Sequence, residues 1–160
     1  MYSFPNRTLI LTGANGGIGR EIAKIFFQAG ANLVLTDLDE VGLQAFTKEL
    51  VATKPQDANR VVTMKMDSAK VEDCDRVVKL AQERFGGIDF VIPSAGIYLA
   101  HPVREMTYEQ WRQTMSINLD GVFFLCKRSI PYLKKDSSIV FLSSLAAHRG
   151  ALYNAHYSAR

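Results

Sequence analysis

The sequence predicts an α/β fold in which helices cover both faces of a parallel sheet. Two observations support this: short apolar runs alternate with longer segments of helical period, and a glycine-rich turn joins the first run to the first helical segment. The chain has 160 residues, of which 48% are hydrophobic and 22% are charged. A chain of this length can form one core without disulfides or metals. We therefore expect a single three-layer domain over residues 1–160.

Five apolar runs are the candidate strands of this sheet. Nearly every residue in them is apolar or β-branched, as expected for strands that are covered on both faces. They span residues 8–11, 32–36, 60–64, 90–92 and 138–142. Runs of this kind separated by helical segments indicate βαβ units, and therefore parallel pairing.

Four helices are expected between these strands. The first carries an apolar stripe of Ile18, Ile22, Ile25 or Phe26, and Ala29, and the third carries Val71, Cys74, Val78, Ala81 and Phe85. Gly30 and Gly86 follow these helices, where glycine is the preferred terminator. The second spans residues 41–54, before Pro55. The fourth opens at a Thr107–Gln110 capping box and buries Trp111, Met115, Leu119, Val122, Cys126, Ile130 and Leu133, and Pro131 kinks or ends it.

Composition argues against several classes of protein. The 19 basic and 16 acidic residues give a net charge of +3 without a basic run, so we expect no nucleic-acid partner. No apolar run is long enough for a membrane span, and the first residues lack a signal-peptide pattern, so we expect a cytoplasmic protein with no membrane partner. Two distant cysteines and three isolated histidines predict neither a disulfide nor a metal site.

The turn after the first strand predicts a phosphate-binding site. It reads Thr-Gly-Ala-Asn-Gly-Gly-Ile-Gly over residues 12–19 and leads directly into a helix. Glycines allow the main chain to approach a ligand closely, and the N–H groups of a helix N-terminus attract a diphosphate. The candidate cofactor-binding residues of this turn are Gly13, Asn15, Gly16, Gly17, Ile18 and Gly19. The alternative is that the glycines form a tight turn without binding a ligand.

An acidic residue after the second strand favours a dinucleotide. Asp37 stands 18 residues after Gly19 and follows the second candidate strand. Dinucleotide-binding folds place an acid there to accept hydrogen bonds from the ribose hydroxyls. The Asp37 carboxylate would repel a 2′-phosphate and Leu38 is uncharged, so the predicted cofactor is NAD. No Lys follows the glycines, which excludes a P-loop kinase or GTPase.

The glycine spacing Gly13-x-x-x-Gly17-x-Gly19 resembles that of the short-chain dehydrogenase/reductase family. Asp67 and Ser68 are similar to that family's adenine-contacting position, and Asn118 to its mid-helix active-site Asn. Ser144 lies 13 residues before Tyr157, as the catalytic Ser and Tyr do in the family. One departure is Pro93-Ser94-Ala95-Gly96 in place of the usual Asn-Asn-Ala-Gly, which leaves Ser94, Ala95 and Gly96 as cofactor-binding candidates. The resemblance implies a Rossmann-type doubly wound sheet.

The resemblance also implies an oxidoreductase that transfers a hydride between NAD and a secondary alcohol or ketone. Tyr157 would exchange the substrate proton, Ser144 would bond the substrate oxygen, and Asn118 would hold a water or kink its helix. In the family a Lys four residues after the Tyr supplies a positive charge beside the phenol. This sequence ends at Arg160, three residues after Tyr157. We do not expect Arg160 to replace that Lys, because it points about 100° away on a helix.

Two other functions remain open from the sequence. One is a non-catalytic nucleotide-binding module, either truncated or regulatory, and the other is a nucleoside-sugar epimerase of the same fold. The chain resembles the N-terminal two-thirds of a family member, with the C-terminal strands and helices missing. We therefore expect the fifth strand to expose apolar side chains and the protein to aggregate or to assemble as a homodimer or homotetramer.

Overall fold

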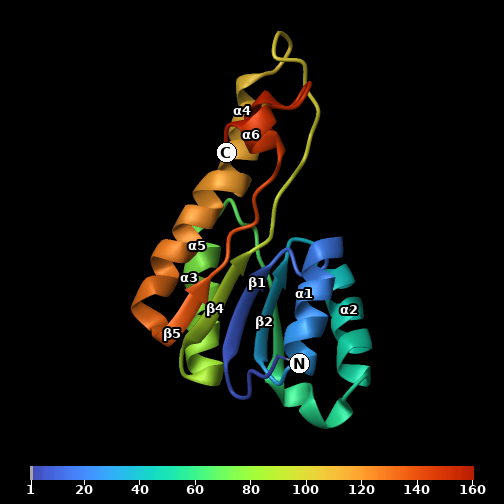
Figure 1. Ribbon diagram of the computed structural model, residues 1–160, viewed down its shortest axis with the longest axis vertical. Coiled ribbons are helices and arrows are strands. Elements are labelled where there is room, and N and C mark those ends of the chain that lie inside the picture. The colour runs from blue at the N-terminus through green and yellow to red at the C-terminus, as the bar shows by residue number, and fades with distance from the viewer. Residues whose placement is uncertain (1) are drawn as a thin grey trace.

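The computed structural model describes residues 2–160 and contains one five-stranded parallel sheet (Figure 1). The strands lie in the order β3-β2-β1-β4-β5. Their bounds are β1 Thr8–Thr12, β2 Asn32–Asp37, β3 Val61–Lys65, β4 Ile88–Pro93 and β5 Leu133–Ile139. The order reverses at β1, so the connections run outward in both directions from the centre of the sheet.

Helices cover both faces of the sheet, which makes three layers (Figure 1). The helical elements are α1 Gly17–Gln28, α2 Glu40–Ala52, η1 Pro55–Arg60, α3 Val71–Phe85, α4 Tyr108–Met115, η2 Ser116–Asp120, α5 Gly121–Ser129, η3 Ile130–Tyr132, α6 Ala146–Arg149 and α7 Ala155–Ser158. Helices α1 and α2 contact one face, and α3 and α5 contact the other. The predicted doubly wound α/β fold is confirmed.

The period of two along β1 divides its side chains between two cores. Leu9 and Leu11 point to the core that includes Ala23 and Phe27 of α1. Ile10 points to the opposite core with the buried residues of α3. All five residues of β1 are buried, because side chains alternate between two covered faces.

The first four predicted strands agree with β1 to β4 within two residues at each end, and the fifth prediction is wrong in position. The fifth strand begins at Leu133 and ends at Ile139 rather than spanning residues 138–142. Pro131 ends the preceding helix early, and the chain then pairs irregularly with β4, with Asp136 at a φ of 62°. Most of β5 is partly or fully exposed, unlike β1 and β2.

The apolar stripe predicted for α1 faces partly the wrong way. Ile18 and Ile25 are exposed at 64% and 52%, whereas Gly19, Ala23 and Phe27 are buried. Small residues let this helix approach the sheet closely, since a Cβ at Gly19 would overlap the Gly13 carbonyl oxygen. Ile18 and Ile25 therefore lie away from the sheet, whereas Phe27 fills the core.

The predicted fourth helix is interrupted. The Thr107–Gln110 capping box is confirmed, and α4 begins directly after it. A π-helical turn, η2, then separates α4 from α5 and leaves Leu119 exposed rather than buried. Extra residues in a π turn rotate the following side chains relative to a regular helix, and such turns are frequent at functional sites.

A C-terminal segment, which we define as residues 140–160, extends past the carboxyl ends of the strands (Figure 1). Its helices α6 and α7 contact each other, and α7 contacts α4. The His101 N–H donates to the Tyr153 carbonyl at 2.7 Å and joins this segment to the loop after β4. Across residues 2–160, no helix is both long and apolar enough to cross a bilayer.

Candidate functional site

A cleft of about 380 Å³ lies at the carboxyl ends of the central strands. Its lining residues are Gly13, Asn15, Gly16, Thr36, Asp37, Leu38, Met66, Asp67, Ser68, Ser94, Ala95, Gly96, Ile97 and Ile117. This is where the strand order reverses, the usual ligand position in an open α/β sheet. The structure thus brings together most of the predicted cofactor residues from four separate stretches of sequence.

The glycine turn has a main-chain shape that side chains would prevent. Gly13 has a φ of 65°, and a Cβ there would lie 2.8 Å from the Ala95 nitrogen. Gly16 precedes α1, whose first N–H groups have no preceding helical turn to accept them. Gly17, Ile18 and Gly19 form that first turn and do not line the cleft. The turn is therefore a main-chain cradle at a helix N-terminus, as a diphosphate requires.

Two hydrogen bonds fix the Asp37 carboxylate at the end of β2, and its oxygens can still accept hydrogen bonds from a ligand. Its Oδ2 accepts from the Asn15 N–H at 2.9 Å, and its Oδ1 accepts from the Asp39 N–H at 3.0 Å. Each carboxylate oxygen can accept two hydrogen bonds, so both retain an acceptor site. A carboxylate oriented in this way can accept from two neighbouring hydroxyl groups.

The loop after β4 closes one side of the cleft and is held by two side chains. The Ala95 N–H donates to the Thr12 Oγ1 at 3.1 Å. Asn118, 6% exposed in the π turn, accepts from the Ile97 N–H at 2.9 Å and donates to the Ile97 carbonyl at 2.8 Å. These bonds hold the turn at Pro93-Ser94, where the sequence differs from the usual Asn-Asn of the family. Asn118 uses its carboxamide on the main chain rather than facing the cleft.

The side of the cleft next to β3 is acidic. The Asp67 Oδ1 accepts from the Ala69 N–H at 3.0 Å, and Lys70 approaches its Oδ2 at 3.9 Å. The Asp67 N–H itself donates to the Asp73 Oδ2 at 2.9 Å, so the start of α3 braces this loop. Asp67 and Ser68 thus lie where a ligand extending from Asp37 would reach them.

The predicted catalytic residues are not gathered at the cleft. Neither Ser144 nor Tyr157 lines it, and no hydrogen bond joins their side chains within residues 2–160. The Ser144 Oγ accepts from the Ala146 N–H at 3.2 Å. The Tyr157 ring contacts Tyr98 edge-on at 4.6 Å, and the Arg160 guanidinium lies 3.8 Å from its centroid. The Arg160 charge therefore faces the ring and not the hydroxyl.

Burial shifts the pKa of three groups away from the cleft. It raises the pKa of the Cys74 thiol to about 11 and also raises the pKa of Cys126. It lowers the pKa of His156, with a smaller contribution from the charge of His101. Both thiols are therefore protonated at neutral pH, which removes them as candidate nucleophiles. In the part of the chain that the structure describes, no group of three metal-ligating side chains is found.

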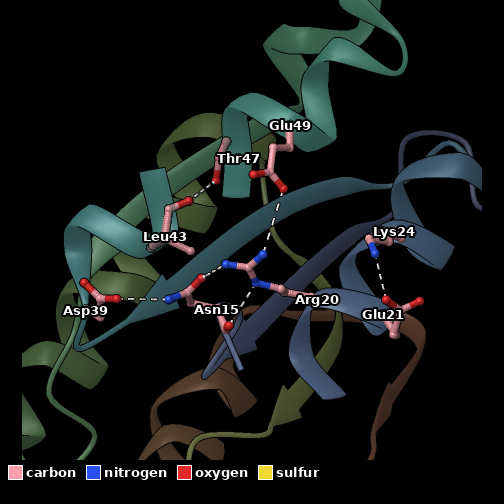
Figure 2. A network of polar contacts seen from close by, with 8 residues as sticks. All are labelled: Asn15, Arg20, Glu21, Lys24, Asp39, Leu43, Thr47 and Glu49. Carbon is pink, nitrogen blue, oxygen red and sulfur yellow. Dashed lines mark hydrogen bonds and ion pairs between the residues drawn. The ribbon is translucent and has the colours of Figure 1, made fainter. Parts of the chain in front are cut away.

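Sequence reasoning missed several residues of the site. Thr36, Met66, Ile97 and Ile117 line the cleft without belonging to a recognisable motif. Arg20 and Asp39 hold Asn15, which does line it (Figure 2). The available signal for Asp39 was its place before α2, where an acid caps the helix by accepting from the Gly42 N–H.

The residues present fit a dinucleotide. The cradle lacks side chains where a Cβ would meet main-chain atoms, and Asp37 offers acceptors next to it. A family model described as short chain dehydrogenase matches residues 7–160. The chain belongs to the short-chain dehydrogenase family.

Individual relatives agree with this family membership. The chain is 30% identical over 161 residues to an uncharacterized oxidoreductase of Staphylococcus aureus strain MRSA252, covering 99% of this chain and 67% of that protein. It is 31% identical over 158 residues to an L-fucose dehydrogenase of Oryctolagus cuniculus, covering 98% and 53%. The chain thus spans between about half and two thirds of these relatives.

A solved structure of the family is similar throughout this short-chain dehydrogenase chain. A crystal structure from Brucella melitensis, a short-chain dehydrogenase/reductase described as glucose/ribitol dehydrogenase, superposes with a TM-score of 0.93 at 60% identity. The match covers 99% of this chain and 65% of that one. Membership supports dehydrogenase or reductase chemistry with a nicotinamide cofactor.

Proposed function

We propose that this chain forms the cofactor-binding part of an NAD-dependent enzyme that interconverts a secondary alcohol and a ketone. One observation carries the choice of NAD: the described lining of the cleft holds two carboxylates, Asp37 and Asp67, and no Lys or Arg. A 2′-phosphate adds roughly two negative charges, which an acidic wall disfavours. The ribose hydroxyls of NAD instead donate to carboxylate oxygens.

Each part of the site has a distinct task in this proposal. The main-chain N–H groups at the start of α1 bind the diphosphate, and Asp37 orients the adenosine ribose. NAD, when bound, supplies or accepts the hydride. Ser144 orients the substrate oxygen, and Tyr157 holds the proton that the oxygen gains or loses. Asn118 fixes the loop that closes the cleft.

The substrate class and the assembly state are argued from the relatives and from exposed apolar side chains. Two relatives are described as dehydrogenases of L-fucose and of glucose or ribitol, which supports an alcohol or carbonyl substrate of small size. Phe123, Ile130 and Phe141 are exposed at 58%, 60% and 61%. These apolar side chains support a homodimer or homotetramer, and sedimentation velocity measures that state directly. We propose no nucleic-acid or membrane partner.

Calorimetric titration with NAD and with NADP tests the cofactor. We expect NAD to bind more tightly than NADP. Asp37→Arg should shift the ratio of the two Kd values toward NADP by about 10- to 100-fold, because a charge-assisted bond to the added phosphate replaces a repulsion. Wild-type protein that binds neither dinucleotide contradicts the proposal, as does an unchanged ratio in the variant.

A nucleotide-binding module without turnover is the second candidate. The position of Tyr157, against Tyr98 and Arg160 and outside the cleft, favours it. Steady-state assays with NAD and a panel of secondary alcohols distinguish the two functions. Turnover that Tyr157→Phe abolishes while NAD binding persists supports the enzyme. Tight NAD binding with no turnover on any alcohol or ketone supports the module.

A further inference from the structure

Arg20 lies outside the cofactor cleft but holds a residue that lines it (Figure 2). Its Nε donates to the Asn15 carbonyl oxygen at 3.0 Å, and its Nη2 donates to the Asn15 Oδ1 at 2.7 Å. One guanidinium thus binds both oxygens of one residue of the glycine turn. This two-point contact fixes the main chain of Asn15 and the orientation of its carboxamide together.

The oriented carboxamide completes a ring of hydrogen bonds between the turn and the end of β2. The Asn15 Nδ2 donates to the Asp39 Oδ2 at 3.1 Å, and the Asn15 N–H donates to Asp37. The Asp39 N–H closes the ring by donating to the other Asp37 oxygen. Asp39 is thereby held two residues from Asp37, with its second oxygen capping α2 through the Gly42 N–H.

The Arg20 guanidinium also contacts two side chains of α2. Its guanidinium carbon lies 4.9 Å from the centroid of the Phe46 ring, and its Nη1 is 3.9 Å from a carboxylate oxygen of Glu49. Both partners belong to α2, the helix that Asp39 caps. Arg20 therefore braces the glycine turn against α2 rather than presenting its charge to the cleft.

We propose that Arg20 is a positioning residue of the dinucleotide site: by fixing the Asn15 carboxamide it holds Asp39 beside Asp37, so that two carboxylates oppose a 2′-phosphate. The inference rests on the proposed function and deepens it by naming a second acidic group and the residue that positions it. Asp39 adds its charge at the ribose end of the cleft although it is not part of the lining.

The direction in which the ratio Kd(NADP)/Kd(NAD) changes when Arg20 is replaced distinguishes a positioning role from a purely electrostatic one. NADP is more negative than NAD, so loss of a nearby cation should by charge alone weaken NADP further and raise the ratio Kd(NADP)/Kd(NAD). Loss of positioning has the opposite effect, because an unheld Asp39 turns toward solvent and opposes the phosphate less. The two explanations thus predict shifts of opposite direction in the same variant.

The experiment titrates the chain and its variants with NAD and NADP at fixed ionic strength. Arg20→Met removes the donors but keeps a flexible apolar stem on Phe46, and Lys24→Met is the matched control. Lys24 lies one turn further along α1 and pairs with the surface Glu21 at 2.7 Å (Figure 2). Asp39→Asn removes the second carboxylate, and Glu40→Gln makes the same charge change at the adjacent exposed residue.

We expect Arg20→Met and Asp39→Asn each to lower the ratio Kd(NADP)/Kd(NAD) by about three- to tenfold, the effect of one lost polar interaction. Lys24→Met and Glu40→Gln should leave it within about twofold. In the Asp39→Asn background, Arg20→Met should change the ratio by less than about twofold, because both act through one carboxylate. Thermal melting checks that each variant is folded, and Asp39→Asn tests the second carboxylate even if Arg20→Met does not fold.

An unchanged or raised ratio in Arg20→Met overturns the positioning role while leaving NAD preference intact. Equal shifts in Asp39→Asn and Glu40→Gln overturn the specific role of Asp39, since they would reflect net charge alone. Wild-type protein that binds neither dinucleotide, or that prefers NADP, overturns the proposed function together with this inference. The failures are distinguishable because only the last appears in the unmodified protein.

Discussion

The cofactor cleft and the C-terminal segment differ in how their residues are held. At the cleft, β1 is fully buried, and the Asp37 carboxylate and the Arg20 guanidinium tie the turn after it. The Thr12 hydroxyl at the end of β1 holds the loop after β4. In residues 140–160 only Asn154 and His156 are buried. Four buried polar side-chain atoms of this segment lack a partner: Asn154 Oδ1, His156 Nε2, Ser158 Oγ and Arg160 Nε.

The rigid region is the one proposed to bind the cofactor, and the less firmly held region carries the residues proposed for proton transfer. A site that uses main-chain N–H groups needs a rigid turn, and the cleft has one. The residues proposed to move a proton, Ser144 and Tyr157, lie on a segment with little buried apolar surface and unsatisfied polar atoms. Segments of that kind open at low cost in free energy. We therefore expect perturbations at the cleft to cost more than those in the C-terminal segment.

Gly13→Ala should break the cleft and produce the largest effect. Its side chain would meet the Ala95 main chain at 2.8 Å and would adopt a φ of 65°. Left-handed backbone and overpacking together cost about 2–5 kcal/mol. Urea unfolding should show this loss in the free energy of unfolding, and NAD binding should be lost with it.

Gly17→Ala is the matched control for the stability measurement. A Cβ at Gly17 meets nothing within 4 Å, and the residue begins α1. Replacement of Gly by Ala in a helix favours the folded state by up to about 1 kcal/mol. If Gly13→Ala were as stable as Gly17→Ala, the close approach between the glycine turn and the β4 loop would be wrong.

Asn118→Ala should loosen the loop after β4, which closes one side of the cleft, at intermediate cost. It leaves the N–H and carbonyl of the partly buried Ile97 without their partner, which costs about 1–3 kcal/mol. Hydrogen exchange should increase in the loop after β4. Ser116→Ala in the same π turn removes only an exposed bond to the Gln113 carbonyl and should stay within about 0.5 kcal/mol. Equal hydrogen exchange in Asn118→Ala and Ser116→Ala would contradict the role of Asn118 in holding the loop after β4.

The same division explains what the sequence could predict. Strands β1 to β4, the cap at Gly86 and the turn at Gly13 follow from local rules, since period, glycine and capping need no knowledge of distant contacts. Asp37 was predictable because its place at a strand end determines where its carboxylate lies.

The failures involve contacts between distant residues. Hydrophobicity alone favoured Ile18 and Ile25 as the buried face of α1, but the space next to the sheet admits Gly19 and Ala23. The position of β5 depends on its irregular pairing with β4. The contacts of Arg20 with Phe46 arise only when α2 packs beside the turn, and spacing between motifs did not predict that Tyr157 would contact Tyr98.

The smallest expected effect is a pH response confined to the C-terminal segment. His156 is fully buried, its Nδ1 accepts from the Tyr157 N–H at 3.0 Å, and its ring lies 5.5 Å from that of His101. Burial and the His101 charge lower its pKa below the ordinary value of 6.5. The unfolded chain thus binds this proton more tightly than the folded one, so the stabilisation is complete above pH 6.5 and declines as the pH falls below it.

Hydrogen exchange of residues 150–160 at pH 7.5 and pH 5.5, corrected for the intrinsic rates, measures this response. We expect lower protection at pH 5.5, with the β1 to β4 sheet unaffected. His156→Gln should remove most of the difference, because a neutral side chain has no proton to gain, whereas His148→Gln on the exposed face of α6 should behave as wild type. A response that persists in His156→Gln, or one that spreads to the sheet, would mean that the segment is not loosened by this buried imidazole.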